Sequence, residues 1–202
     1  GGMKEYWDVF ENEPMAQGGC IWDWVDQSFR EVDQDGNWYW TYGGDYGPKD
    51  VPSFGNFCCN GLVNAVREPH PHLLEVKKIY QNIKSTLVDK KNLTIRVKNW
   101  FDFSDLNEYL LHWSVTGDDG TIVAEGSKEV TCAPHAVVDI TLGAVKLPKT
   151  LREAYLNLSW TRVKATPLVT SDWEVAYDQF VLPVSKNSWS GKPAKAGNTT
   201  FA

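Results

Sequence analysis

The stretch AYLNLSWTRVKA, residues 154–165, alternates apolar with polar side chains, which is the pattern of a β-strand that buries one face. The same period of two recurs in LTIRVKNWFDF (93–103), YLLHWSVTG (109–117), TIVAEGSKEV (121–130), AVVDITL (136–142) and WEVAYDQFVLPV (173–184). Turn residues such as Asp118-Asp119-Gly120 separate these stretches. Six to eight strands without intervening helices predict an antiparallel, immunoglobulin-like β-sandwich over residues 86–186. Residues 187–202, which are mostly small and polar, are expected to form a linker or tail.

Composition limits the partners of the chain. Its 202 residues are 42% hydrophobic, enough to bury a core, and its formal charge is -6. An acidic chain is a poor partner for nucleic acid, because neutralising phosphates requires clustered Lys and Arg. No apolar run approaches the roughly 20 residues of a membrane helix, so no membrane partner is expected. The compartment is left open. The ten tryptophans are unusual, since indole is a good stacking surface for sugars although most tryptophans fill cores.

The four cysteines offer neither a zinc motif nor a disulfide framework, because no C-x-x-C pair exists. We expect Cys20, Cys58, Cys59 and Cys132 to be free and mostly buried.

The N-terminal third of the chain combines helical and strand patterns. Apolar residues from Met3 to Phe10 recur at helical spacing and predict a helix over 2–13, followed by a buried strand at CIWDWV, residues 20–25. Asp35-Gly36 predicts a hairpin within 29–42. A long Gly- and Pro-rich segment leads to a second helix predicted over 71–81, because Leu73, Val76, Tyr80 and Ile83 recur at helical spacing. This αβ unit is typical of parallel sheets and barrels, yet one unit cannot close a barrel, so residues 1–85 are expected to belong to something larger.

Several motifs, in order and correctly spaced, resemble the family-two β-galactosidases. They are GGMKEYWDVFENEPMAQGGCIWDWVDQS (1–28), YGGDYG (42–47), FCCNGLV (57–63), PHPHLLEVKKIYQNIK (69–84) and NEYLLHW (107–113). The resemblance implies that residues 1–85 are the C-terminal part of a (β/α)8 catalytic barrel: a helix, the eighth strand, its long loop and a closing helix. It implies that residues 86–186 are the sandwich domain that follows. The fold class expected is therefore mainly β, with the last α/β elements of an incomplete barrel before the sandwich.

The resemblance also implies site residues. Trp22 matches a tryptophan that lines the galactose pocket, while the carbonyl of Phe57 and the side chain of Asn60 match ligands of a sodium ion that touches the sugar. Magnesium in the parent enzyme would be held by residues outside this chain. Retaining hydrolysis needs two carboxyl groups about 5–5.5 Å apart. The resemblance places both outside this chain, and we expect no catalytic residue here and no activity from the chain alone.

Nearby polar residues receive structural interpretations. Asp23 and Asp26 are expected to hydrogen-bond backbone groups or arginines and so to shape the loop. His70 and His72 have a spacing that suits a metal, but they flank Pro71 at a helix start, which favours capping or packing. The sandwich tryptophans, Trp100, Trp113, Trp160 and Trp173, are expected in the core.

Besides an intact small enzyme, two classes of function remain open. The first is a non-catalytic fragment of a glycosidase whose parent hydrolyses β-galactosides such as lactose and whose partners are its own remaining domains. The second is a self-standing carbohydrate-binding or scaffold module. If residues 1–85 lack their barrel neighbours, their aromatic side chains are expected to pack back on the sandwich or to cause self-association.

Overall fold

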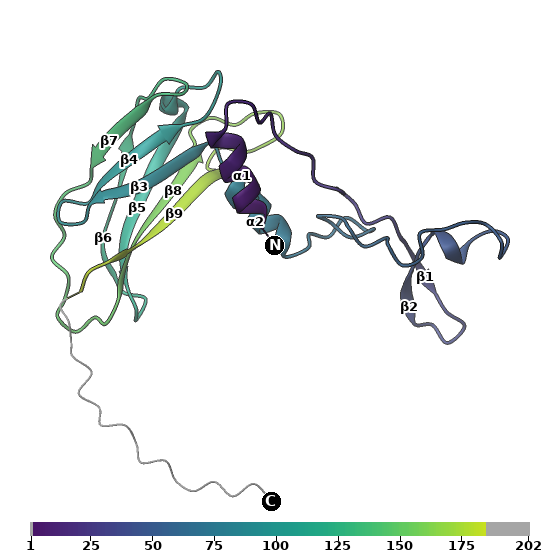
Figure 1. Cartoon of the computed structure of the whole chain (residues 1–202). Coiled ribbons are helices and arrows are strands. Elements are labelled where there is room, and N and C mark those ends of the chain that lie inside the picture. The colour runs from purple at the N-terminus through teal and green to yellow at the C-terminus, as the bar shows by residue number, and fades with distance from the viewer. Residues whose placement is uncertain (1, 185–202) are drawn as a thin grey trace, which may run out of the picture. The chain divides into compact units, whose positions relative to one another are not determined.

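The computed structural model describes residues 2–184 (Figure 1). The chain divides into two compact units, Gly1–Gln81 and Asn82–Ala202, and each is described by itself. The predicted tail at 187–202 lies outside the described residues. No helix in the described part of the chain is both long enough and apolar enough to span a membrane.

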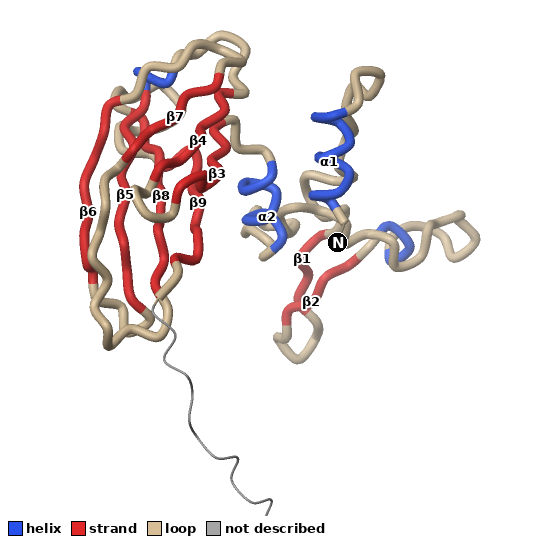
Figure 2. The backbone as a smooth tube through the Cα atoms, turned by 60° about the vertical axis from the view of Figure 1, so that its left-hand side comes forward, coloured by secondary structure: helices blue, strands red, loops and turns tan. Residues whose placement is uncertain are grey.

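The second unit is a sandwich of two antiparallel sheets (Figure 2). One sheet has the strand order β3-β4-β7 and the other β6-β5-β8-β9. The strands are β3 (Ile83–Asp89), β4 (Thr94–Asn99), β5 (Tyr109–Gly117), β6 (Ile122–Glu129), β7 (Val137–Thr141), β8 (Ala154–Arg162) and β9 (Glu174–Leu182), and a short 3-10 helix, η2 (Leu106–Glu108), precedes β5. The six alternating stretches each contain one of these strands, so the predicted sandwich is confirmed.

The core of the sandwich lies between the two sheets. On β8, Leu156, Leu158 and Trp160 are buried and the residues between them are not, as the alternation predicted. Trp160 is fully buried. The prediction for the sandwich tryptophans is wrong for Trp173, which is 51% exposed beside the start of β9. Trp113 and Trp100 are half-buried.

The strand β3 was not predicted, because its first residue continues the apolar spacing of the preceding helix. That helix, α2 (His72–Ile79), falls within the predicted 71–81. Ile83 was assigned to the helical pattern, but it starts β3 and is completely buried in the sandwich core. Helical and strand periodicities overlap at this one residue, so the sequence pattern could not separate the two elements.

The first unit contains α1 (Met3–Asn12), the strands β1 (Phe29–Val32) and β2 (Trp38–Thr41), a short 3-10 helix, η1 (Gly43–Asp45), and α2. The predicted first helix and the hairpin are both confirmed. The hairpin turns at Asp33, whose carboxylate accepts hydrogen bonds from the backbone of Asp35 and Asn37. Gly36 supplies the positive φ of 83° that the turn requires.

The buried strand predicted at 20–25 is wrong for this structure. The segment is irregular, and its only ladder contact with the described residues is an isolated parallel bridge between Val25 and Val63. Trp22 and Trp24 are exposed. The described residues form no closed barrel, so this segment has no parallel strand beside it, and a strand buried on both faces cannot form without such neighbours.

Candidate functional site

Two segments far apart in the sequence run side by side in the first unit, and together they hold the residues predicted to bind sugar. Backbone hydrogen bonds join residues 23–27 to residues 58–63. They run from Asp23 N to Asn60 O (2.8 Å), Leu62 N to Trp24 O (3.0 Å), Asp26 N to Val63 O (2.9 Å) and Gln27 N to Cys58 O (2.7 Å). The WDWVDQ and FCCNGLV motifs are therefore one structural element rather than two.

The carboxylate of Asp26 fastens this element from the inside. Its Oδ1 accepts a 2.7 Å hydrogen bond from the backbone N–H of Gly61, and its Oδ2 lies 2.8 Å from Nε2 of His70. Asp26 is 6% exposed, so both oxygens exchange water for protein partners. A buried carboxylate is tolerated only when it is paired in this way.

The close approach of the two segments requires glycine at position 61. A Cβ at this position would lie 2.2 Å from the backbone nitrogen of Asp26 and 2.5 Å from the carbonyl carbon of Val25. Both are backbone atoms that cannot move aside, so only glycine allows the two segments to approach so closely. The carbonyl of Gly61 lies 2.8 Å from Nε2 of His72.

The acidic and histidine residues of this element hydrogen-bond with its own segments. Asp23 accepts hydrogen bonds from the backbone of Trp24 and the side chain of Gln27, so both aspartates shape the loop as expected, although histidine and glutamine take the place of arginine. The two histidines do not cap α2, whose N-cap, Pro71, has no side-chain hydrogen bond. Their rings stack 5.3 Å apart. Each histidine binds the loop instead.

The residues predicted to contact sugar or sodium all lie in or beside this element. Trp22 is 71% exposed and immediately precedes the bonded Asp23. Phe57 is 62% exposed and precedes the bonded Cys58. Asn60 is half-buried, and its Nδ2 is buried with no hydrogen-bond partner in the structure. Sequence reasoning thus named Trp22, Phe57 and Asn60 but missed the clamp of Asp26, Gly61 and His70 that joins their segments. The available signal was an aspartate directly after the apolar run CIWDWV.

The cysteines are free as predicted, but the expectation that they are mostly buried is wrong. Cys132 is buried in the sandwich, Cys20 and Cys59 are exposed, and Cys58 is half-buried. The thiols of Cys58 and Cys59 lie 3.8 Å apart. These two residues follow Phe57 in an irregular segment, and the hydrophobic core cluster of the described residues is made only of sandwich residues, so this segment contributes nothing to it. In the described part of the chain, no group of three His, Cys, Asp or Glu residues could hold a metal ion.

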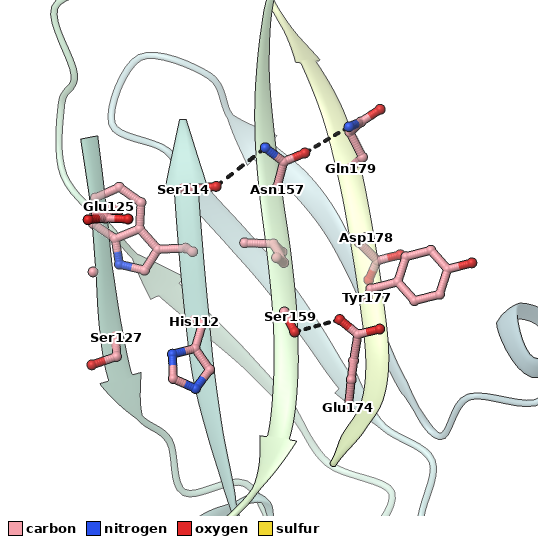
Figure 3. Close-up of a pocket in the computed structure, with 13 residues that line it drawn as sticks. His112, Ser114, Glu125, Ser127, Asn157, Ser159, Glu174, Tyr177, Asp178 and Gln179 are labelled. Carbon is pink, nitrogen blue, oxygen red and sulfur yellow. Dashed lines mark hydrogen bonds between the residues drawn. The ribbon is translucent and has the colours of Figure 1, made fainter. Parts of the chain in front are cut away.

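The second unit carries a separate groove of about 810 Å³ on the outer face of the four-stranded sheet (Figure 3). Its floor consists of two rows of polar side chains that cross the sheet. The strand registers align Ser127, His112, Ser159 and Tyr177 in one row, and Glu125, Ser114, Asn157 and Gln179 in the other. The amide of Asn157 donates to Ser114 and accepts from Gln179, so these three residues of the second row are connected. Sequence reasoning did not predict this groove.

Comparisons with known proteins match two separate regions of the chain. Residues 1–85 match the family described as glycosyl hydrolases family 2, TIM barrel domain, and residues 95–183 match β-galactosidase domain 4. The chain therefore belongs to family 2 of the glycosyl hydrolases. The two matched regions correspond to segments of the barrel domain and of domain 4 in that family.

The relatives named β-galactosidase are much longer than this chain. The protein of Aeromonas hydrophila is 37% identical over 185 residues, which cover 91% of this chain and 18% of the relative. That of Priestia megaterium is 38% identical over 196 residues, covering 96% of this chain and 19% of the relative. Among solved structures, the exo-chitosanase of Amycolatopsis orientalis with PNP-β-D-glucosamine aligns with a TM-score of 0.41 and 16% identity over 63% of this chain and 14% of that one. A likeness of that size supports no conclusion. This chain thus spans less than a fifth of the length of its curated relatives.

Proposed function

We propose that the complete protein is a retaining β-galactosidase and that this segment supplies one wall of its galactose subsite. The observation that carries the proposal is the pairing of residues 23–27 with 58–63, which holds Trp22 beside the loop of Phe57 and Asn60. Relatives that bear the name β-galactosidase support the sugar class.

In this proposal Trp22 is the apolar platform of the subsite. An indole that is 71% exposed beside a rigidly bonded loop offers a flat face to the C–H groups of a sugar ring. Such a face excludes water from one side of the ligand and fixes its orientation, while a few polar groups provide specificity. Trp24, two residues later, accepts backbone hydrogen bonds from Leu62 and Val63 and has a structural role.

Phe57 and Asn60 would hold the sodium ion, and their surroundings fit such a role. The carbonyl of Phe57 accepts no hydrogen bond within the described residues. The terminal amide of Asn60 is buried without a partner on its nitrogen, and turning the amide by 180° presents its oxygen instead. Neutral oxygens suit a monovalent ion. The bound ion would supply a positive charge that attracts a sugar hydroxyl; remaining ligands, and the magnesium site, would come from other parts of the enzyme.

The catalytic carboxyl pair would likewise come from other parts of the enzyme. Asp26 is committed to Gly61 and His70, and Asp23 to Trp24 and Gln27, so neither is available as a nucleophile or an acid. We therefore propose that the chain alone is inactive. Hydrolysis of a nitrophenyl galactoside by the isolated chain, lost on mutation of either aspartate, would contradict this.

The test of the subsite uses the complete enzyme that contains this segment. Trp22→Ala should raise KM for a nitrophenyl galactoside at least about tenfold, because the loss of a stacking platform costs more than about 1.4 kcal/mol of binding. Trp38→Ala, which removes an exposed tryptophan from the hairpin, is the matched control and should leave KM unchanged. Equal effects of both substitutions would refute the role of Trp22. Nitrophenyl glucuronide and mannoside in parallel assays establish the sugar class.

The exposed aromatic side chains of the first unit support one further proposal, that the isolated chain self-associates. Tyr6, Trp22, Phe29, Phe54 and Phe57 are all exposed. Large apolar side chains exposed in such number are usually covered in a functional protein, by another domain or by a second molecule. Sedimentation should show oligomers that dissociate as the chain is diluted, and a monomer at every concentration would contradict the proposal.

The alternative, a carbohydrate-binding module, is favoured by the groove on the sandwich. Its rows of serine, asparagine and glutamine side chains offer hydrogen bonds to sugar hydroxyls. Titration of the chain with lactose, followed by tryptophan fluorescence, distinguishes the module from the partial galactose subsite. Binding at millimolar concentration or tighter that is lost in Asn157→Ala favours the module, whereas no binding by the isolated chain agrees with a partial subsite.

A further inference from the structure

The adjacent thiols of Cys58 and Cys59 form a two-sulfur site of their own. The two sulfurs lie 3.8 Å apart, far beyond the roughly 2.05 Å of a disulfide, so both are thiols. Cys59 is exposed and Cys58 is half-buried, so a small reagent can reach the pair. Adjacent side chains on a strand point to opposite faces. Here a turn over residues 55–58 brings them to the same side.

The backbone around the pair is held in place on both sides. The carbonyl of Cys58 accepts a 2.7 Å hydrogen bond from the backbone of Gln27, and the carbonyl of Asn60 accepts a 2.8 Å bond from Asp23. The N–H of Cys58 is bonded to the carbonyl of Asn56. A ligand that needs both sulfurs therefore meets them already positioned, and little conformational entropy is lost on binding.

The spacing of the sulfurs suits a single soft atom between them. Thiolate sulfurs lie about 2.3 Å from a tetrahedral ion such as zinc, which sets two of them about 3.8 Å apart. A structural zinc ion needs four ligands, yet no third His, Cys, Asp or Glu joins the pair within the described residues. The site instead suits a soft centre that requires only two sulfurs. Arsenic(III) bearing one carbon substituent is such a centre.

We propose that Cys58 and Cys59 are a vicinal dithiol site that captures trivalent organoarsenicals. The reaction with phenylarsine oxide is a condensation. Two As–S bonds form, the arsenic–oxygen bond breaks, and the two thiol protons leave with that oxygen as one water molecule. Arsenic stays in the +3 state and both sulfurs stay at the thiol oxidation level, so the step needs neither an oxidant nor a reductant.

The test uses the whole 202-residue chain and phenylarsine oxide as the probe. Mass spectrometry should show one phenylarsenic group per chain, and peptide mapping should place it on the peptide that contains Cys58 and Cys59. The adduct should survive excess mercaptoethanol and be released by dimercaptopropanol. Cys58→Ser or Cys59→Ser should weaken binding about 100-fold or more, because each removes the chelate.

Cys20→Ser is the matched control, since Cys20 is also exposed, and it should bind normally. Loss of binding in this control would mean that a different pair is used and would overturn the proposal, as would full binding by either serine variant. Peptide mapping of the chain without substitutions shows which cysteines carry the phenylarsenic group, even if a serine variant misfolds.

A consequence for activity rests on the proposed function. The thiols lie between Phe57 and Asn60, so a bound arsenical would displace the proposed sodium ligands. In the complete enzyme, phenylarsine oxide should abolish galactosidase activity, dimercaptopropanol should restore it, and Cys59→Ser should resist. If the complete enzyme has no galactosidase activity, the proposed function is wrong. Capture of phenylarsine oxide by the isolated chain is decided separately, by mass spectrometry and peptide mapping.

Discussion

Oδ1 of Asp26 lies 2.7 Å from the backbone nitrogen of Gly61, a residue 35 positions further along the chain. This single hydrogen bond connects the segment that follows Trp22 to the segment that contains Asn60. Because both groups are buried, neither can replace its partner with water. The relationship between these two residues leads to the first three predictions.

Removal of the Asp26 carboxylate should loosen the paired segments. Asp26→Ala leaves the buried N–H of Gly61 without an acceptor, which costs about 1–3 kcal/mol. Amide hydrogen exchange should report a loss of protection at Gly61 and Leu62, with the amides of β5 and β8 unchanged. Asp35→Ala in the exposed hairpin turn serves as the control. Unaltered protection of Gly61 in Asp26→Ala would show that the carboxylate does not hold the loop.

The second prediction concerns His70, whose Nε2 lies 2.8 Å from Oδ2 of Asp26. His70→Phe keeps a ring of similar shape but removes the partner of a buried carboxylate, and it should accelerate exchange at Gly61. His70→Gln can still donate to Asp26 and should restore much of the protection. Equal exchange in the two variants would indicate that ring packing, rather than the hydrogen bond, is the contribution of this side chain.

Gly61→Ala is predicted to separate the two segments. The added methyl group would lie 2.2 Å from the nitrogen of Asp26, and overpacking of this kind typically costs about 1–3 kcal/mol. Gly43→Ala is the matched control, because a Cβ at Gly43 meets nothing within 4 Å and Gly43 has no positive φ. Limited proteolysis between residues 28 and 60 should accelerate only in Gly61→Ala. The same rate in both variants would contradict the close approach.

In the sandwich, two tryptophans should differ sharply. Trp160→Ala empties a fully buried site and should lower the free energy of unfolding by about 3–5 kcal/mol. Trp173→Ala removes a side chain that is 51% exposed and should have a much smaller effect. Urea denaturation followed by circular dichroism measures both. A cost for Trp173→Ala as large as that for Trp160→Ala would be inconsistent with the observed burial.

A pH effect is expected from the pair of Arg96 on β4 and Asp139 on β7. The guanidinium donates two 2.8 Å hydrogen bonds to the carboxylate and holds the pKa of Asp139 below its usual value. The pair therefore contributes stability above the unfolded-state pKa of about 3.9, and this contribution is lost as the pH falls through the lower folded-state pKa. The stability difference between the wild type and Arg96→Met should shrink on acidification. Lys90→Met is the control, and a difference that does not depend on pH would refute the prediction.

The sequence predicted the sandwich well because each strand has one buried face, and a period of two records that burial directly. Trp160 and Leu158 show this on β8. Prediction failed where an element depends on neighbours that the pattern does not include. The segment at 20–25 is apolar enough for a strand, but its parallel pairing within the described residues is limited to the single bridge of Val25 with Val63. Ile83 fitted two periodicities at once.

The sequence named only some of the residues at the candidate site, and the sugar- and sodium-binding roles that it gave them stay predictions. Trp22, Phe57 and Asn60 were named from the resemblance, whereas Asp26, His70 and Gly61 were assigned no joint role. Their contacts join positions 26, 61 and 70, and no local pattern reports a hydrogen bond across such a separation. The groove on the sandwich was missed for a related reason, since its rows form only when four strands are set in register.

The clamp between Asp26 and Gly61 has a consequence for how this region tolerates change. Residues 28–57 leave the clamp and return to it, so both ends of this excursion are anchored whatever lies between them. Doubling the length of an anchored loop adds only about 0.6 kcal/mol of closure entropy. Insertions and deletions within the hairpin and its following loop should therefore cost little stability. New recognition elements can be grafted into this stretch without disturbing the paired segments 23–27 and 58–63.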